Sequence, residues 1–222
     1  MTDTPWADVD HYLIDLLIPA DDALTHAVEA SAAAGLPPIA VTPPLGKLLH
    51  ILARAMGAKR ILEVGTLGGY STIWLARAAG PGGHVTTLEL DPKHAELAAA
   101  NIAYAGLSGS VDIRLGRAVE SLATLHAEGG APYDMIFIDA DKASIPEYFT
   151  WSLKLTRPGS LILVDNVIRN GAVIDASSSD PNVIGVRRFN EMLAVETRVT
   201  ATTIQTVGAK GYDGMTFAIV NA

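Results

Sequence analysis

Oxygen-bearing side chains follow two apolar segments of this sequence. Asp139 ends the segment MIFID, and Asp165 and Asn166 end the segment LILVDN. Continuous apolar runs of this length are typical of parallel strands that are buried on both faces of a sheet. In an open α/β sheet, ligands bind beyond the carboxyl ends of such strands. Two carboxylates and one amide at that edge form an all-oxygen donor set, which predicts a site for Mg²⁺, Mn²⁺ or Ca²⁺ rather than for zinc.

A glycine-rich turn lies upstream, in the segment ILEVGTLGGYST that spans residues 61–72. Its glycines, of which Gly65 is the first, allow the backbone to approach a ligand closely. Ser71 or Thr72 is expected to cap the helix that follows. The Gly-x-x-Gly-Gly spacing differs from the G-x-G-x-x-G pattern of dinucleotide-binding enzymes, in which a pyrophosphate sits against the helix. By itself the turn is also compatible with a plain strand-to-helix connection.

Two acids near this turn narrow the choice of ligand. Glu63 precedes the turn, where a carboxylate would repel a phosphate and favour a cation. Glu89 ends the next predicted strand, where a carboxylate can accept hydrogen bonds from both ribose hydroxyls, with Asp91 as a second candidate for that role. S-adenosylmethionine fits these features because it carries a ribose, no phosphate, and positive charges on its amino group and sulfonium.

The elements that must position these residues alternate between strands and helices, which predicts a doubly wound parallel sheet. The C-terminal segments 199–207 and 215–220 flank the turn-forming stretch GAKGYDG and predict an antiparallel hairpin. The expected fold class is therefore α/β, a Rossmann-like seven-stranded sheet, mostly parallel, with N-terminal helices. The other strands are predicted at residues 61–64, 84–90, 111–115, 135–139 and 161–165, and the helices between and after them at residues 70–79, 92–105, 118–127, 144–155 and 183–195.

The N-terminal part is expected to be helical. Residues 8–35 carry apolar side chains at helical spacings and predict one or two helices. The proline-rich segment 36–44 interrupts them. Thr42, followed by two prolines, predicts the N-cap of a further helix that ends near residue 55.

Composition limits the class of protein. With 222 residues, 49% hydrophobic and 18% charged, the chain is expected to fold as one ordered domain. A formal net charge of −8 argues against nucleic acid as a partner. Zero cysteines exclude disulfides, thiolate chemistry and cysteine-based zinc sites. The sequence contains neither a signal-peptide pattern nor a membrane-spanning segment, so a cytoplasmic protein without a membrane partner is expected.

The order of these motifs resembles that of a known family. With Glu63, Gly65, Glu89, the DADK of residues 139–142 and the VDN of residues 164–166, the chain resembles the cation-dependent class I O-methyltransferases. That group contains the catechol and caffeoyl-coenzyme A O-methyltransferases. The similarity extends from about residue 42 to the C-terminus. It implies a single methyltransferase domain over residues 1–222, in which residues 1–41 form a helical cap and 42–222 the cofactor- and metal-binding core.

The resemblance implies a role for each matching residue. Asp139, Asp165 and Asn166 are similar to the divalent-metal ligands, and Asp139 is also implied to contact the cofactor and to take part in catalysis. Lys142 is similar to the catalytic lysine near the acceptor hydroxyl. The remaining cofactor contacts are implied at Thr42, at Glu63 and Gly65 beside the methionine part, at Ser71 near its carboxylate, at Glu89 on the ribose and at Ala118 beside the adenine.

The chain departs from the family pattern in two places. Many members place an aromatic residue after the VDN motif, where it packs on the acceptor ring, whereas Ile168 and Arg169 stand here. A simple flat catechol is therefore in doubt as the natural acceptor, and Arg169 could pair with a carboxylate or phosphate on a larger one. Arg117 is a bulky charged residue beside the expected adenine position.

The expected function is transfer of a methyl group from S-adenosylmethionine to a vicinal-diol, catechol-like small molecule, with a divalent cation, Mg²⁺ first. The resemblance also suggests a homodimer through the N-terminal helices and the sheet edge. Three alternatives stay open: a metal-independent methyltransferase, a nicotinamide-dependent oxidoreductase, and a non-catalytic protein on the same scaffold.

Overall fold

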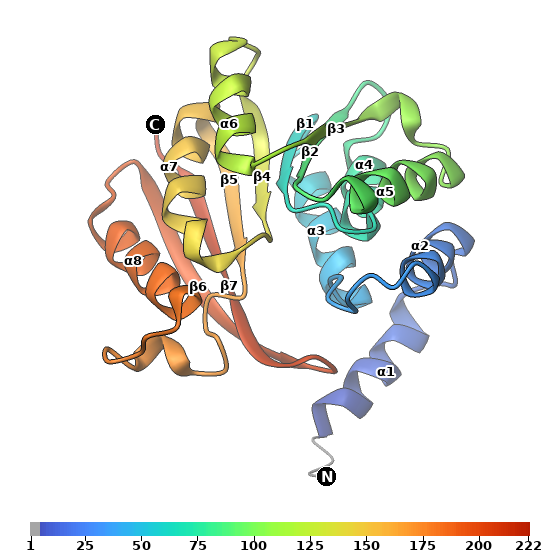
Figure 1. Cartoon of the computed structure of the whole chain (residues 1–222), viewed down its shortest axis with the longest axis horizontal. Coiled ribbons are helices and arrows are strands. Elements are labelled where there is room, and N and C mark those ends of the chain that lie inside the picture. Colours follow the sequence, from blue (N-terminus) through green and yellow to red (C-terminus); the bar gives the residue numbers. More distant parts are fainter. Residues whose placement is uncertain (1–4) are drawn as a thin grey trace.

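A computed structural model describes residues 5–222 and has the predicted α/β architecture (Figure 1). Over this range the strands form one seven-stranded sheet in the order β3-β2-β1-β4-β5-β7-β6. Five strands are parallel, and β7 pairs antiparallel with both β5 and β6, so the predicted fold class is confirmed. The strands are β1 (Arg60–Val64), β2 (His84–Glu89), β3 (Val111–Leu115), β4 (Tyr133–Ile138), β5 (Thr156–Asp165), β6 (Val199–Gly208) and β7 (Gly211–Val220).

Helices cover both faces of the sheet, with α6, α7 and α8 on one face and α3, α4 and α5 on the other (Figure 1). No helix within residues 5–222 is long and apolar enough to cross a membrane. The helices are α1 (Pro5–Leu17), α2 (Asp22–Ala33), α3 (Pro43–Ala55), α4 (Tyr70–Ala79), α5 (Pro92–Tyr104), α6 (Ala118–Ala127), α7 (Ile145–Leu155) and α8 (Pro181–Val195), with short 3₁₀ turns η1 (Ser108–Ser110), η2 (Lys142–Ser144) and η3 (Ala172–Ile174).

The core explains why the strands read as unbroken apolar runs. Successive side chains of a strand point to opposite faces, and both faces of this sheet are covered. Phe137 therefore packs in the cluster under α3 and α4, whereas its neighbours Ile136 and Ile138 pack in the cluster under α7 and α8. All three side chains have no exposed surface.

The carboxyl ends of β1 and β4 meet at the point where the strand order reverses. From β1 the chain continues to β2 and β3 on one side, and β4 and β5 lie on the other. Backbone hydrogen bonds join the first residues beyond these strands: Gly65 N–H donates to the Leu88 carbonyl and Asp139 N–H donates to the Val64 carbonyl. In doubly wound sheets this reversal opens a crevice for ligands.

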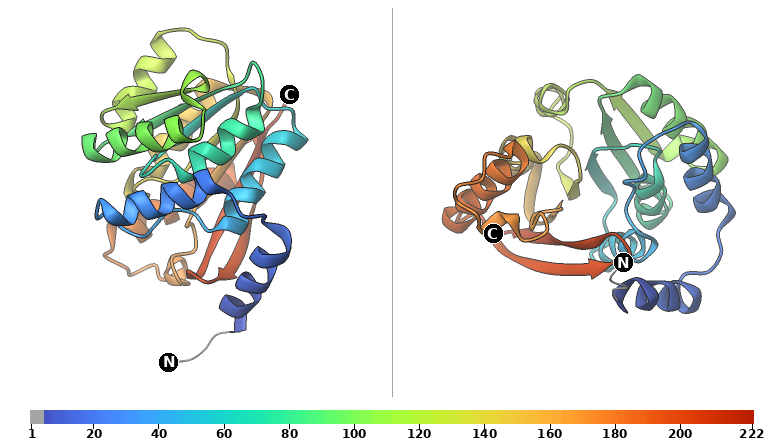
Figure 2. Two further views of the ribbon diagram at one scale, coloured as in Figure 1. Left: turned by 90° about the vertical axis from the view of Figure 1, so that its right-hand side faces the viewer. Right: turned by 60° about the horizontal axis from the view of Figure 1, so that its bottom comes forward.

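The N-terminal segment predicted as one or two helices forms two. Asp21 caps α2 by accepting from Leu24 N–H and pairs with Arg77 of α4 at 2.8 Å, which attaches α2 to the core. The helix α1 lies beside the tip of the β6–β7 hairpin (Figure 2) and has no buried side chain within residues 5–17. Its exposed Tyr12 and Leu16 belong to the surface on which the predicted homodimer would form, and that assembly stays a prediction.

The strand boundaries differ from the prediction most clearly at two strands, which begin earlier than expected. β5 begins at Thr156 rather than near residue 161, and β7 begins at Gly211 rather than at residue 215. The hairpin turn is therefore only Ala209 and Lys210, because Tyr212 and the residues after it stay paired with β6. Lys210 at this turn donates to the Ala40 carbonyl, so the hairpin tip contacts the proline-rich segment.

Candidate functional site

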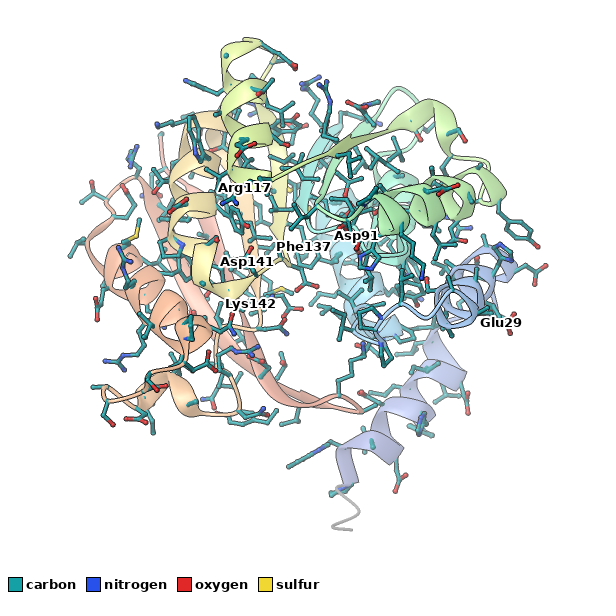
Figure 3. All side chains as sticks on the ribbon, in the orientation of Figure 1. Glu29, Asp91, Arg117, Phe137, Asp141 and Lys142 are labelled. Atoms are coloured by element: carbon teal, nitrogen blue, oxygen red, sulfur yellow. The ribbon has the colours of Figure 1, made fainter. Side chains whose placement is uncertain are left out.

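A cavity of about 800 Å³ opens at the carboxyl edge of the parallel strands. Its walls come from α2, the proline-rich segment and the turns that follow β1, β2, β3, β4 and β5. Figure 3 shows Arg117, Asp141 and Lys142 on the α6–α7 side of this region and Asp91 on the opposite, α5 side. The predicted site residues that line the cavity are Gly65, Ser71, Glu89, Ala118, Asp139, Lys142 and Asn166, whereas Thr42, Glu63 and Asp165 are not part of its lining.

Gly65 is required by the contact between the two central strand ends. Its φ is 103°, a backbone conformation that residues with a side chain rarely adopt. A Cβ atom added there would lie 2.3 Å from the backbone oxygen of Asp139. The glycine-rich turn is predicted to lie close to a ligand. At Gly65 it also packs directly against the backbone of Asp139.

Replacing Gly65 by alanine is expected to lower the free energy of unfolding by about 2–3 kcal/mol, because the added Cβ would overlap backbone that cannot move away. Urea unfolding of the variant checks this. Gly57→Ala is the matched control, since Gly57 has a φ of 67° but no atom within 4 Å of an added Cβ. Only the cost of a left-handed backbone, about 1 kcal/mol, is expected there. Equal losses in the two variants would contradict the proposed overlap.

Glu63 is fully buried in a cage of hydroxyl groups. The hydroxyls of Ser71, Thr72 and Thr87 donate to its carboxylate at 2.5, 2.5 and 2.7 Å. Burial raises the pKa of Glu63 to about 7, and these three hydrogen bonds oppose that rise. Because Glu63 does not line the cavity, its predicted contact with the cofactor stays a prediction.

The prediction that Ser71 or Thr72 caps α4 is wrong. The N-cap of α4 is Gly69, which has a φ of 80° and no capping side chain. Ser71 and Thr72 lie inside the first turn of α4, past the capping position, and their hydroxyls donate to the buried carboxylate of Glu63. Ser71 still lines the cavity, and its contact with the cofactor stays a prediction.

Glu89 joins the glycine-rich turn to the end of β2. Its Oε2 atom accepts from Thr66 N–H at 3.2 Å and from Leu67 N–H at 2.8 Å. Its Oε1 atom accepts from Leu90 N–H and Asp91 N–H, both at 2.9 Å. The side chain of Asp91, the second candidate for the ribose, instead caps α5 by accepting from that helix's first N–H groups. Of these two acids, Glu89 is the one that lines the cavity.

The three predicted metal ligands converge beyond β4 and β5. Asp165 is buried at the end of β5, and burial, followed by the charge of Asp139, raises its pKa to about 7. Lys142, only 8% exposed, places its Nζ atom 2.8 Å from Asp139 Oδ1. Asn166 follows with a φ of 58° and lines the cavity. Asp139 is not a helix N-cap, since Asp141 caps η2.

The donor set suits a hard divalent cation. Within residues 5–222 no three His, Asp or Glu side chains are arranged to hold a metal ion. The predicted donor set instead combines two carboxylates with the Asn166 amide, and it stays a prediction. The mutual repulsion of Asp139 and Asp165, seen in the raised pKa of Asp165, is the electrostatic condition that a bound cation relieves. Carboxylate and amide oxygens are ligands that Mg²⁺ and Ca²⁺ accept.

Thr42, Ala118 and Arg117 occupy the remaining predicted positions. Thr42 is the N-cap of α3, as predicted, and its Oγ1 atom accepts from Leu45 N–H at 3.4 Å. Ala118 begins α6 in the cavity wall. Arg117 lines the cavity but its side chain is 75% exposed and pairs with Glu120 at 3.4 Å. The contacts of Thr42 and Ala118 with the cofactor stay predictions.

Asp213 is a site residue that sequence reasoning missed. Its Oδ1 atom accepts from the N–H groups of Ile168, Arg169 and Gly214 at 2.8–3.0 Å, which fixes the loop that begins at Asn166. In the sequence, Asp213 is next to a glycine in the stretch GAKGYDG, and such a pair is typical of the hairpin turn that this stretch predicts. The pattern gives no indication of a contact with another loop.

Asn101 is a second residue of this kind. Its Nδ2 atom donates to the Gly68 carbonyl at 2.9 Å and holds the glycine-rich turn against α5. The sequence contains one indication of this role: Asn101 is three residues after the apolar Ala98 and therefore lies on the same, buried face of α5.

Comparison with known proteins gives consistent matches. Residues 19–219 match the family model described as O-methyltransferase, a longer stretch than the resemblance from residue 42 onward. A catechol O-methyltransferase from Niastella koreensis is 54% identical over 220 residues, which cover 99% of this chain and 100% of the relative. The O-methyltransferase from Bacillus cereus in complex with SAH has a TM-score of 0.96 and 52% identity, covering 98% of this chain and 99% of that one. An O-methyltransferase from Streptomyces achromogenes involved in tomaymycin synthesis, in complex with SAM, has a TM-score of 0.96 and 53% identity over 100% of both chains.

Proposed function

Because this chain belongs to the O-methyltransferase family and is an S-adenosylmethionine-dependent O-methyltransferase, we propose that it methylates one oxygen of a vicinal diol on a small aromatic acceptor with the help of a divalent cation. The observation that carries the proposal is the cluster of Asp139, Asp165 and Asn166. Asp139 and Asn166 line the same cavity as Glu89, and Asp165 is close enough to Asp139 to feel its charge. The catechol O-methyltransferases among the relatives support a diol acceptor.

Asp139, Asp165 and Asn166 would hold the cation. When bound, it supplies Lewis acidity that lowers the pKa of a phenolic hydroxyl, which is near 10 in water. Mg²⁺ is the first candidate, with Mn²⁺ and Ca²⁺ as alternatives, because all three prefer oxygen ligands.

The protein's own groups orient the reactants. Glu89 presents its carboxylate to the ribose, and the glycine-rich turn allows the cofactor to lie against the backbone. Lys142 Nζ lies 2.8 Å from Asp139 Oδ1. As the neutral amine, released from that pairing, it would accept the proton that the acceptor hydroxyl loses. Holding the acceptor oxygen in line with the methyl carbon and the sulfur can contribute up to roughly 7–11 kcal/mol to the lowering of the barrier.

The test is release of S-adenosylhomocysteine from S-adenosylmethionine with caffeic acid as acceptor, in the presence of Mg²⁺ and again with excess EDTA. Product is expected with Mg²⁺ and is expected to fall to the uncatalysed level with EDTA, because the acceptor hydroxyl then keeps its ordinary pKa. Re-addition of Mg²⁺ should restore the rate, which controls for damage by the chelator.

Three other outcomes would redirect the proposal. Product formation that EDTA does not change would identify a metal-independent methyltransferase. Binding of S-adenosylmethionine without turnover of caffeic acid, catechol or other vicinal diols would reject the acceptor class. Binding of a reduced nicotinamide cofactor in place of S-adenosylmethionine would revive the oxidoreductase alternative.

A further inference from the structure

Arg169 lies in the cavity wall at the place where the family resemblance leads one to expect an aromatic residue. It follows Asn166 by three positions and lines the cavity together with Asn166 and Lys142. From its contacts we infer that its guanidinium binds an anionic substituent, a carboxylate, on the aromatic acceptor. This inference rests on the proposed function and specifies the acceptor class as dihydroxylated aromatic acids.

The guanidinium of Arg169 has unused hydrogen-bonding capacity. Its Nε atom is buried and has no hydrogen-bond partner within residues 5–222. Its Nη1 atom lies 3.9 Å from Asp213 Oδ2, too far for a hydrogen bond. The other oxygen of Asp213 already accepts from three backbone N–H groups. The two Nη atoms also make no hydrogen bond within residues 5–222, and the side chain is 31% exposed in the cavity wall, so these outer N–H groups are the donors that a ligand can reach.

The fold itself does not require a cation at this position. The contact that fixes the loop is made by Arg169 N–H, which any residue except proline would supply. The backbone φ of 55° at Arg169 is one that asparagine or glycine adopts more readily than arginine does. The one charged contact of the guanidinium within residues 5–222 is the 3.9 Å approach to Asp213, which is too long for a hydrogen bond, so its N–H groups are available to a ligand.

The neighbouring charges point to an anion as that ligand. Lys142 already pairs with Asp139 at 2.8 Å, so the acidic cluster has a closer cation than Arg169. The planar fork of a guanidinium matches a carboxylate in a bidentate arrangement. An acceptor whose diol is at the acidic cluster and whose carboxylate is on Arg169 would be held at two points. A neutral catechol would leave the outer N–H groups of the guanidinium without an anionic partner.

The experiment compares 3,4-dihydroxybenzoate with its methyl ester, which has the same diol and ring but no charge. KM and kcat for both are measured with the wild-type protein, Arg169→Gln and Arg169→Lys. In Arg169→Gln the KM for the acid is expected to rise about 10- to 100-fold and that for the ester to stay unchanged. Arg169→Lys should recover part of the loss, because it keeps the charge but not the fork. Glutamine and lysine, like arginine, have a Cβ, so neither adds strain at φ 55°.

Arg157→Gln is the matched control for loss of a positive charge. Arg157 lies at the start of β5, opposite the end that leads to Arg169, and pairs with Asp134 on the surface. Its replacement is expected to change neither KM. Equal rises for acid and ester in Arg169→Gln would mean that Arg169 only supports the loop, and this would overturn the inference. A wild-type protein that does not prefer the acid over the ester would overturn it as well.

A binding measurement separates failure of this inference from failure of the proposed function. Calorimetric titration of the acid and the ester into protein saturated with S-adenosylhomocysteine and Mg²⁺ needs no turnover. Tighter binding of the acid by the wild-type protein, lost in Arg169→Gln, would support the Arg169 site even if no methyl transfer occurs. Equal binding of acid and ester would overturn it even if both are methylated.

Discussion

Replacement of Asp165 by asparagine is expected to lower kcat by more than about 100-fold, because it removes one of the two carboxylates of the proposed cation site. The same change is not expected to lower the melting temperature of the metal-free protein. Asp165 is buried, and its pKa is raised to about 7 by that burial and by Asp139, so a charge at this position is unfavourable without a cation. Asparagine has nearly the same shape and keeps an oxygen that can accept from Asn166 N–H.

Two measurements check this expectation: release of S-adenosylhomocysteine with Mg²⁺ present, and thermal unfolding in EDTA. Asp112→Asn serves as the control, since Asp112 is a half-exposed acid on β3 that pairs with Arg114, and no loss of activity is expected. Asp139→Ala is a less clear test, because it leaves the buried Lys142 without its partner and costs about 3 kcal/mol of stability. Full activity of Asp165→Asn with Mg²⁺ would reject the metal assignment.

The sheet could be predicted from the sequence because its strands are buried on both faces. Segments such as the one that contains Phe137 have no polar face, and few structures other than a covered parallel sheet accommodate them. Thr42 could be predicted as an N-cap because capping depends only on adjacent residues. The ends of β5 and β7 were harder to place, because strand ends depend on pairing with a distant partner rather than on local composition.

The candidate site was predictable where it follows strand ends and unpredictable where it depends on contacts across the chain. Asp139 and Asp165 follow buried strands, and their convergence follows from parallel strand order. The capping role of Ser71 is wrong because the helix begins one residue earlier, at Tyr70, and the partner of its hydroxyl, Glu63, lies on a different element. Asp213 was missed because it contacts a loop 44 to 45 positions away in the sequence. Such a contact forms only after β7 has paired with β5.

Replacement of Glu89 by glutamine is expected to weaken binding of S-adenosylhomocysteine about 100-fold, although the two side chains have nearly the same shape. Each carboxylate oxygen of Glu89 accepts from two backbone N–H groups. A glutamine side chain has only one oxygen, so its NH₂ group must face two N–H donors and leave both without an acceptor. The glycine-rich turn, which Thr66 and Leu67 attach to Glu89, then loses its fixed position beside the cavity.

Calorimetric titration with S-adenosylhomocysteine measures this effect, and Asp91→Asn is its control. Asp91 caps α5 through its Oδ1 atom, which an asparagine retains, so unchanged affinity is expected there. If Asp91→Asn lost affinity and Glu89→Gln kept it, Asp91 would be the ribose-binding acid and the assignment of Glu89 would be wrong. If Glu89→Gln keeps its affinity and Asp91→Asn does too, neither acid binds the ribose. A loss confined to Glu89→Gln would show that affinity depends on this carboxylate, through the turn that it holds or through the ribose, because within residues 5–222 the carboxylate of Asp91 accepts hydrogen bonds from its own helix.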